Sequence, residues 1–174
     1  MVQVAVLGYG TVGSGVVEVL EGNKDNITSR ANEELNVKYI LDLRDFPGDP
    51  YEAKVVHDVN VILDDPEVSV VCETMGGVEP AYTFTKRALM AGKSVCTSNK
   101  ELVASHGPEL LRIAKENHCN YLFGASVGGG IPINGIAALS ISVQVLQTTG
   151  DVSHMLDVLE KQKGVHQVKI LAKE

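Results

Sequence analysis

Short apolar runs alternate with amphipathic segments along most of the chain. The apolar runs are rich in valine, isoleucine and leucine, which is typical of strands buried on both faces of a parallel sheet. The intervening segments repeat their apolar residues every three or four positions, as one face of a helix does. We expect strands at residues 2–7, 37–43, 68–72, 94–97 and 120–123, and helices at 14–20, within 23–35, at 82–91, from 100 onward and at 108–117.

Strands and helices alternate in this way to about residue 132, and this rhythm predicts an α/β fold. We assign residues 1–133 to one domain with a Rossmann-type fold. Such a domain is a doubly wound parallel sheet with helices on both faces and right-handed crossovers.

After residue 133 the pattern changes. Apolar and polar residues alternate at 138–146 and 165–171, and an amphipathic helix is expected at 153–163. Residues 134–174 are therefore expected to form a short C-terminal β-α-β tail, too small to be stable alone. Because its strands would leave open edges, we expect it to act as a dimerisation or regulatory element, and the protein to be a homodimer.

The overall composition narrows the classes of function. The chain has 174 residues, 44% of them hydrophobic, and a net charge of −7, which argues against nucleic acid as a partner. Apolar runs stay far below the roughly 18 residues that a membrane-spanning helix needs. The first residues carry no basic stretch, so we expect a cytoplasmic protein. The three cysteines form no C-x-x-C pair and are interpreted as small buried hydrophobes in a reducing compartment.

The strongest motif is a glycine-rich turn, G-Y-G-T-V-G, directly after the first expected strand. A G-x-G-x-x-G pattern alone is weak evidence, but here it follows a strand and opens a helix, as a dinucleotide-binding turn does. Gly8 permits the tight turn, Gly10 lets a pyrophosphate approach the backbone, and Gly13 lets helix and strand pack closely. The amides at the start of the helix, including those of Thr11 and Val12, would then bind the phosphates.

Two charged residues of opposite sign stand at the end of the second expected strand. An acidic residue at this place, such as Asp42, hydrogen-bonds the ribose 2′-OH of NAD. An arginine, such as Arg44, pairs instead with the 2′-phosphate of NADP. Both types are present, and we favour NADP, or use of both cofactors, through Arg44. With the glycine-rich turn, this makes residues 1–133 the expected NAD(P)-binding domain.

Two further turns are expected at the same edge of the sheet, where ligands bind in open α/β folds. One carries Thr74 and Met75 and then Gly76, and its Gly-Gly pair allows close approach of a ligand to the backbone. The other carries Ser98 and Lys100. An amine beside a reacting carbonyl can hold a proton or stabilise an oxygen as charge develops, so Lys100 is the candidate catalytic residue.

Residues 124–133 form a second glycine-rich stretch with three successive glycines. Carbonyl oxygens freed by such a loop can bind a hard cation, and a hinge between domains is the alternative. The five histidines are dispersed and are interpreted as surface or core residues.

Three segments, V-L-G-Y-G-T-V-G-S-G-V, S-N-K-E-L-V-A and A-S-V-G-G-G-I-P-I, occur in an order and at intervals that resemble homoserine dehydrogenase. The resemblance covers residues 2 to about 133. Members of that family reduce L-aspartate 4-semialdehyde to L-homoserine with NADPH or NADH, in threonine, methionine and isoleucine biosynthesis. The resemblance therefore implies an NAD(P)-dependent oxidoreductase acting on these small molecules.

The resemblance also assigns roles to residues. It implies that the glycine turn holds the pyrophosphate, that Arg44 is the family's basic residue after the second strand, and that Thr74 and Met75 line the nicotinamide side. Lys100 would be the first of two active-site lysines.

The resemblance further implies a sodium ion held by the backbone carbonyls of Val127, Gly129 and Ile131. At this point the chain departs from the family, because Gly124 stands where the family usually has a glutamate.

The family continues past its I-P-I motif with a substrate domain that carries acidic residues and the second lysine, and neither is recognisable here. We therefore expect a shortened form with an incomplete substrate site and weak or absent turnover by this chain alone. One alternative is a non-catalytic NAD(P)-binding or regulatory module. Another is a dehydrogenase with a nucleophilic cysteine, which would need Cys72, Cys96 or Cys119 to be activated.

Overall fold

The computed structural model describes residues 1–123, which form a six-stranded parallel sheet. The strand order is β3-β2-β1-β4-β5-β6, so the chain builds one half of the sheet outward from β1 and then returns to build the other half. This order confirms the predicted Rossmann-type sheet. The expected β-α-β tail at 134–174 lies outside the described residues. The strands are β1 (Val2–Leu7), β2 (Leu35–Leu41), β3 (Val55–Val56), β4 (Val68–Glu73), β5 (Ser94–Thr97) and β6 (Tyr121–Leu122).

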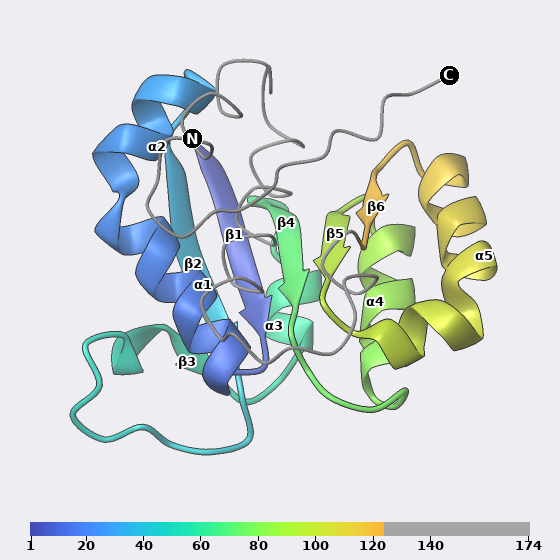
Figure 1. Cartoon of the computed structure of the whole chain (residues 1–174), viewed down its shortest axis with the longest axis horizontal. Helices are drawn as coiled ribbons and strands as arrows, with labels where there is room; N and C mark the ends of the chain where they lie inside the picture. The colour runs from blue at the N-terminus through green and yellow to red at the C-terminus, as the bar shows by residue number, and fades with distance from the viewer. Residues whose placement is uncertain (124–174) are drawn as a thin grey trace, which may run out of the picture.

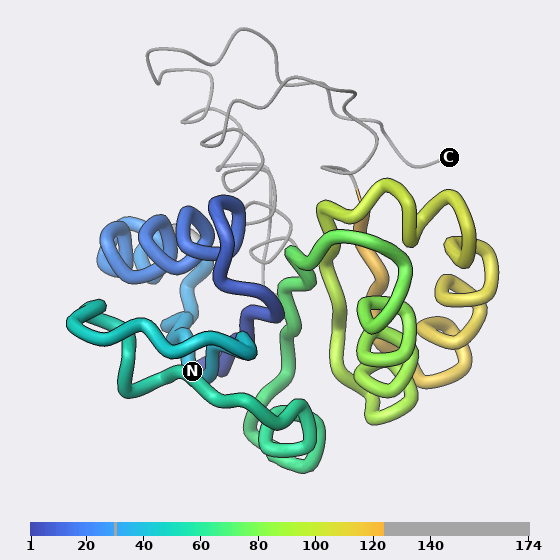
Figure 2. The backbone as a smooth tube through the Cα atoms, turned by 90° about the horizontal axis from the view of Figure 1, so that it is seen from below, coloured from blue at the N-terminus to red at the C-terminus, as the bar shows by residue number. Residues whose placement is uncertain are grey.

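Helices cover both faces of this sheet. In Figure 1, α1 and α2 lie on one side of the strands, and α4 and α5 lie on the other. Figure 2 shows the same two layers along a perpendicular direction. The helices are α1 (Thr11–Gly22), α2 (Lys24–Ala31), the 3-10 turn η1 (Glu52–Lys54), α3 (Asn60–Leu63), α4 (Ala81–Met90) and α5 (Lys100–Glu116).

The central strand β1 is apolar except for the half-buried Gln3, and its position in the sheet explains why. Val4 and Val6 belong to the core beneath α1 and α2, whereas Ala5 and Leu7 belong to the core beneath α3, α4 and α5. All four side chains are fully buried. Because successive residues of a strand point to opposite faces, a strand covered on both faces has no polar side to show.

Apart from shifts of one to three residues at other element ends, the structure differs from the expected elements in three places. β2 begins at Leu35 and ends at Leu41, so Asp42 opens the following loop rather than ending the strand. The short elements β3 and η1 were not expected, because two or three residues carry no periodic pattern. The helix expected from residue 100 and the one expected at 108–117 are a single helix, α5.

Pro108 lies inside α5 without ending it. A proline in a helix leaves the carbonyl four residues earlier without its usual donor, and that residue here is Ala104. Ala104 is exposed, so water can satisfy its carbonyl. The proline therefore did not mark a boundary between two helices.

All the strands run the same way, so the turns after β1, β2, β4 and β5 gather at one edge of the sheet. This carboxyl edge holds the candidate site. Within residues 1–123, no helix combines the length and apolar character needed to cross a membrane.

Candidate functional site

The glycine turn between β1 and α1 has the backbone geometry that its sequence requires. Gly8 adopts φ +94°, a region that residues with a Cβ rarely occupy, and its N–H donates to the Leu41 carbonyl at 2.8 Å. A Cβ added at Gly13 would lie 1.9 Å from the Gly8 oxygen, so only glycine fits there. A Cβ at Gly10 would meet no atom within 4 Å, so the space beside Gly10 is open.

The first turn of α1 is left ready for an anion. No side chain caps the helix at Gly10, and its first turn holds no acidic residue. Thr11 is exposed and Val12 is half-buried at this end. The unpaired amides and the positive end of the helix dipole together favour a phosphate group here.

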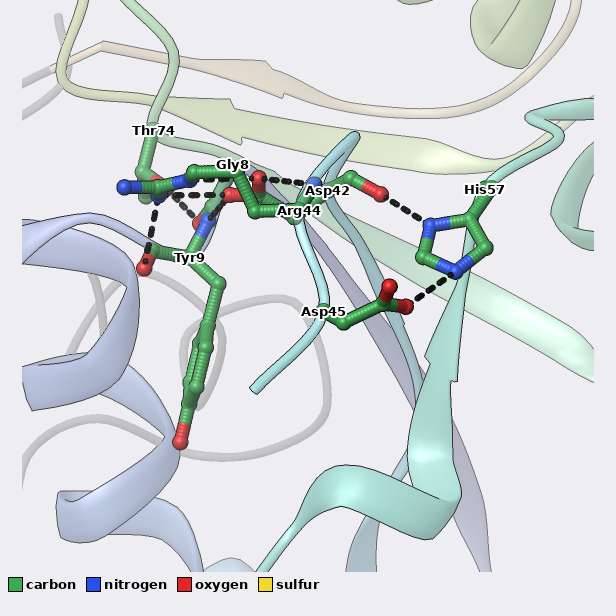
Figure 3. Close-up of polar contacts among 7 residues, drawn as sticks. All are labelled: Gly8, Tyr9, Asp42, Arg44, Asp45, His57 and Thr74. Carbon is green, nitrogen blue, oxygen red and sulfur yellow. Dashed lines mark hydrogen bonds and ion pairs between the residues drawn. The ribbon is translucent and has the colours of Figure 1, made fainter. Parts of the chain in front are cut away.

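Thr74 joins the turn after β4 to the glycine turn. Its hydroxyl lies 2.8 Å from the Gly8 carbonyl oxygen and 3.0 Å from that of Leu7, and its N–H donates to the Leu7 carbonyl at 2.9 Å. Figure 3 shows Thr74 beside Gly8. Met75 follows, with its Cγ 3.0 Å from the position that a Cβ at Gly8 would take. Gly76 is exposed beyond them.

Asp42 is the centre of the polar contacts in Figure 3. Its Oδ2 accepts from the Tyr9 N–H at 2.9 Å and from Arg44 Nη2 at 3.0 Å. Its Oδ1 accepts from the Arg44 N–H at 3.0 Å and from Arg44 Nε at 2.9 Å. The hydrogen bonds from Arg44, together with that from the Tyr9 N–H, hold the pKa of Asp42 well below its usual range. The carboxylate is therefore ionised and has its acceptor positions filled.

Arg44 is tied to Asp42 but remains accessible. Its side chain is 63% exposed, and its Cζ lies 5.1 Å from the centre of the Phe46 ring. Nη2 also donates to the Tyr9 carbonyl at 3.3 Å. No hydrogen bond within residues 1–123 uses Nη1, so this nitrogen can still donate to a ligand.

Tyr9 anchors the loop that carries Arg44. Its ring meets the Phe46 ring edge to face at a centroid distance of 4.9 Å, and its hydroxyl donates to Asp49 at 3.2 Å. Burial, with the hydrogen bond to Asp49, raises the pKa of Tyr9 to about 12, so the hydroxyl keeps its proton. The loop after β2 is thus fixed to a side chain inside the glycine turn.

A cavity of about 570 Å³ opens between the glycine turn and this loop, and most of its lining is apolar. Leu43 is 90% exposed although it is a large apolar residue, and it forms part of the lining. An exposed leucine beside an apolar cavity suits a flat, apolar-faced ligand group such as a nucleobase. The apolar wall is made by Leu41, Leu43, Val59, Met75, Pro80 and Phe84.

His57 also lines this cavity, a position that its sequence context did not indicate. Its Nδ1 lies 2.7 Å from the Asp42 carbonyl oxygen, which can only accept, so Nδ1 carries the hydrogen. Its Nε2 lies 3.2 Å from the Asp45 carboxylate. His57 follows β3, and because that strand is only two residues long, no pattern in the sequence placed it beside Arg44.

The turn after β5 presents Lys100 at the start of α5. Lys100 is exposed, and no hydrogen bond or ion pair joins its amine to another residue within 1–123. A positive charge at a helix N-terminus opposes the helix dipole, so this place does not serve helix stability. Half-buried Ser98 precedes it, and the Ser98 N–H donates to the Glu73 carbonyl at 3.2 Å.

Glu73 lies between these turns and is fully buried. Burial raises its pKa to about 7, against the opposing effect of hydrogen bonds from Thr97, the Met75 N–H and Asn99. A carboxyl group that titrates near neutrality at the ligand edge of a sheet was not predicted from the sequence. Its signal was weak, since a single glutamate after an apolar run usually faces solvent.

All three cysteines lie within the described residues as free thiols. Cys72 and Cys96 are free, buried thiols, and the pKa of Cys72 is raised by its hydrogen bond with Cys96 and by burial. Burial also raises the pKa of Cys119, so these data give no support to a thiolate nucleophile.

No group of three or more His, Cys, Asp or Glu side chains among residues 1–123 could hold a metal ion. The sodium ligands expected at Val127, Gly129 and Ile131, and Gly124 beside them, lie outside the described residues.

Comparison with known proteins gives a consistent answer. Residues 8–124 match the family model "Homoserine dehydrogenase, NAD binding domain". A homoserine dehydrogenase of Lactococcus lactis is 36% identical over 91% of this chain, and one of Bacillus subtilis is 36% identical over 95%. The chain spans only 37% and 40% of the lengths of those two relatives.

Solved structures agree with the sequence relatives. A homoserine dehydrogenase of S. aureus, solved at pH 8.5, superposes with a TM-score of 0.68 at 39% identity, over 74% of this chain and 33% of that protein. A hyperthermophilic archaeal homoserine dehydrogenase mutant in complex with NADPH gives a TM-score of 0.61 at 27% identity, over 78% of this chain and 47% of that protein.

Proposed function

The chain belongs to the homoserine dehydrogenase family, and from this we propose that it is the nucleotide-binding part of an enzyme that interconverts L-homoserine and L-aspartate 4-semialdehyde. The observation that carries the proposal is the glycine turn, with open space at Gly10 and an uncapped helix behind it, within the segment that matches the family model. The cofactor is NADP(H) or NAD(H). The reaction is proposed for the whole enzyme, because the chain spans about 40% of a relative's length.

Each part of the cofactor has a counterpart at the carboxyl edge of the sheet. The pyrophosphate would accept hydrogen bonds from the amides at the start of α1, beside Thr11 and Val12. The adenine would occupy the apolar cavity that Leu43 lines. The nicotinamide would extend past Thr74 and Met75 toward Ser98 and Lys100.

The paired side chains of Asp42 and Arg44 favour NADP(H). Asp42 has its acceptor positions filled by Tyr9 and Arg44, so it is a poor partner for the ribose 2′-OH of NAD. Arg44 keeps its Nη1 donors for the 2′-phosphate of NADP, while Asp42 holds the guanidinium in place.

Lys100 is proposed as the residue of this chain that acts on the substrate. The bound nicotinamide supplies or accepts a hydride at the carbon that carries the oxygen. In the reductive direction the Lys100 ammonium would donate a hydrogen bond to the aldehyde oxygen as negative charge develops there. Its exposed position at the start of α5 leaves it accessible to a small aldehyde.

We place the reaction in threonine, methionine and isoleucine biosynthesis, in the cytoplasm. The tail at 134–174 is proposed to support a homodimer, and the carbonyls of Val127, Gly129 and Ile131 to hold a sodium ion.

Calorimetric titration of NADPH and NADH into this chain tests the proposal. We expect NADPH to bind, and Lys100→Ala to weaken that binding. Lys115→Ala is the matched control, because Lys115 is an exposed lysine in the last turn of the same helix. Failure of both cofactors to bind a folded chain would contradict the proposal. Binding without NADPH oxidation when the semialdehyde is added would leave the nucleotide-binding role and assign catalysis to the rest of the enzyme.

A further inference from the structure

Glu73, the last residue of β4, is the one fully buried acidic residue in the described part of the chain. Burying a carboxylate is costly unless it accepts hydrogen bonds, so the donors that contact Glu73 indicate its role. Its Oε1 accepts from the Met75 N–H at 2.7 Å, and its Oε2 accepts from the Thr97 hydroxyl. The two oxygens therefore bind two different turns, the one after β4 and the one after β5.

The contacts continue from Thr97 to the start of α5. The Thr97 Oγ1 accepts from the Asn99 N–H at 2.9 Å. The Asn99 side chain caps α5 by accepting from the Leu102 N–H at 3.0 Å, and its amide donates to the Gly77 carbonyl at 2.6 Å. Asn99 is itself buried, and Lys100 is the next residue. The place of Lys100 thus depends on hydrogen bonds that begin at Glu73.

The contacts also continue from Met75 to the glycine turn. Met75 packs against Gly8. Thr74 beside it donates its hydroxyl to the Gly8 carbonyl at 2.8 Å; Figure 3 draws this pair. Glu73 is therefore the common member of two chains of contacts. One chain reaches the pyrophosphate turn, and the other reaches the catalytic lysine.

We propose that Glu73 is a positioning residue, whose carboxylate sets the spacing between the Met75 turn and the Lys100 turn so that both contact the nicotinamide end of the cofactor. The inference rests on the proposed function of cofactor binding. Glu73 does not touch the cofactor, because its side chain is fully buried.

The ionised form is required for this role. A carboxylate accepts from the Met75 N–H and the Thr97 O–H with one oxygen each, whereas a protonated carboxyl group carries an O–H that must itself find an acceptor. If Glu73 were protonated and donated to Thr97, the Thr97 hydroxyl, which already accepts from Asn99, would lose the acceptor for its own hydrogen. Protonation would therefore loosen the link between the two turns.

Both forms are accessible near neutral pH, because burial raises the pKa of Glu73 to about 7. Among the described residues, no titratable neighbour changes its own charge in this pH range in a way that would balance the ionisation of Glu73. Tyr121 of β6 stays neutral, since burial raises its pKa further above its usual range. Cys72 and Cys96 belong to the core on the other face of the sheet, and Lys100 of α5 is exposed. Keeping a carboxyl group that burial disfavours is costly for the fold, which fits a role in the site.

The test measures the dissociation constant of NADH between pH 5.5 and 8.5 for the wild type and Glu73→Gln. NADH is used because it lacks the 2′-phosphate, which titrates in the same range. We expect wild-type affinity to rise roughly 2- to 10-fold as the pH passes through about 7, which corresponds to one hydrogen bond. Glu73→Gln cannot ionise, so it should keep the weak affinity at every pH. Glu101→Gln, an exposed change beside Lys100, should leave the pH step intact.

Two readouts separate this inference from the proposed function. If the cofactor binds but the pH step persists in Glu73→Gln, the inference is wrong and the proposed function stands. Amide hydrogen exchange of the free chain gives a test that needs no cofactor: Glu73→Gln should speed exchange at Met75 and Leu102, and unchanged rates at both would overturn the inference. Thr97→Val keeps the shape but removes the hydroxyl, so it should speed exchange at Leu102 while Met75 stays protected.

Discussion

The Asp42 carboxylate binds the Arg44 guanidinium through two parallel hydrogen bonds, from Nε to Oδ1 at 2.9 Å and from Nη2 to Oδ2 at 3.0 Å. This arrangement changes the meaning of an acidic residue after the second strand of a Rossmann sheet. Such a residue commonly accepts from the ribose of NAD. Here it orients an arginine that lines the cavity, and within residues 1–123 the Nη1 donors of that arginine are not used.

Removing the Arg44 side chain should weaken NADPH binding much more than NADH binding. Hydrogen bonds to charged groups contribute about 1.5–3 kcal/mol, so Arg44→Ala is expected to raise the dissociation constant of NADPH roughly 10- to 100-fold. Arg112→Ala is the matched control, because Arg112 is a similarly exposed arginine on α5 that pairs with Glu116. Titration calorimetry measures both cofactors. Equal losses for NADPH and NADH would contradict the assignment of Arg44 to the 2′-phosphate.

Alanine substitutions at Gly10 and Gly13 should have different effects. Gly13→Ala places a Cβ 1.9 Å from the Gly8 oxygen, so we expect a loss of at least about 1–3 kcal/mol in the free energy of unfolding. A Cβ at Gly10 meets no protein atom within 4 Å, and Gly10 has φ −86°, which alanine tolerates. Gly10→Ala should therefore fold normally and bind NADPH poorly.

Urea unfolding and cofactor titration of both variants check this difference. A stable Gly13→Ala chain would mean that the turn can open. Normal NADPH binding by Gly10→Ala would mean that the pyrophosphate does not approach the backbone there.

Asp42→Asn should lower stability in a pH-dependent way. The pKa of Asp42 is depressed in the folded chain, so its contribution is present above the unfolded-state pKa of about 3.9 and disappears as the pH falls toward the folded-state value. We expect a loss of about 1–3 kcal/mol at pH 7, because donors from Tyr9 and Arg44 lose a charged acceptor.

Urea unfolding at pH 7, 4 and 3 measures this loss. The difference between wild type and Asp42→Asn should narrow at pH 3, whereas an equal difference at every pH would argue against the ion pair. Asp25→Asn, at an exposed position in α2, serves as the control and should cost little.

Glu73 should affect stability in the opposite direction. Its folded-state pKa is raised from 4.5 to about 7, so the native chain binds more protons than the unfolded chain between these values. Stability should therefore fall as the pH rises through this window, by up to roughly 3 kcal/mol when the shift is converted to free energy. Thermal unfolding from pH 5 to 8 should show this slope in the wild type and a flatter profile in Glu73→Gln. The same slope in both chains would mean that another group is responsible.

The sequence predicted those parts of the fold that depend on regular periodicity. The strand at Ser94–Thr97 and the first strand at Val2–Leu7 have the expected bounds, because most of their residues are buried on both faces and are apolar. The glycine turn was predictable for a similar reason, since Gly8 and Gly13 meet steric limits that no other residue satisfies.

Relations across space were not predictable in this way. Asp42 and Arg44 were both named as ribose ligands, but only the folded loop shows that one binds the other. His57 was interpreted as a surface or core residue, because its neighbours in sequence do not indicate its contacts with Asp42 and Asp45. The two-residue strand β3, which precedes His57, brings it beside them. Glu73 looked like the start of a loop, and its burial depends on Thr97, which is distant in sequence and adjacent in the sheet.

The contacts of Tyr9 with Phe46 and Asp49 have a consequence for protein engineering. The loop from Arg44 to Asp49 cannot be exchanged on its own, because it packs on Tyr9, which lies within the glycine turn. A loop transplanted from an NAD-specific relative would bring new ribose contacts but leave the phenol without its partners. A change of cofactor preference in this fold should therefore require the residue at position 9 and the loop to be replaced together.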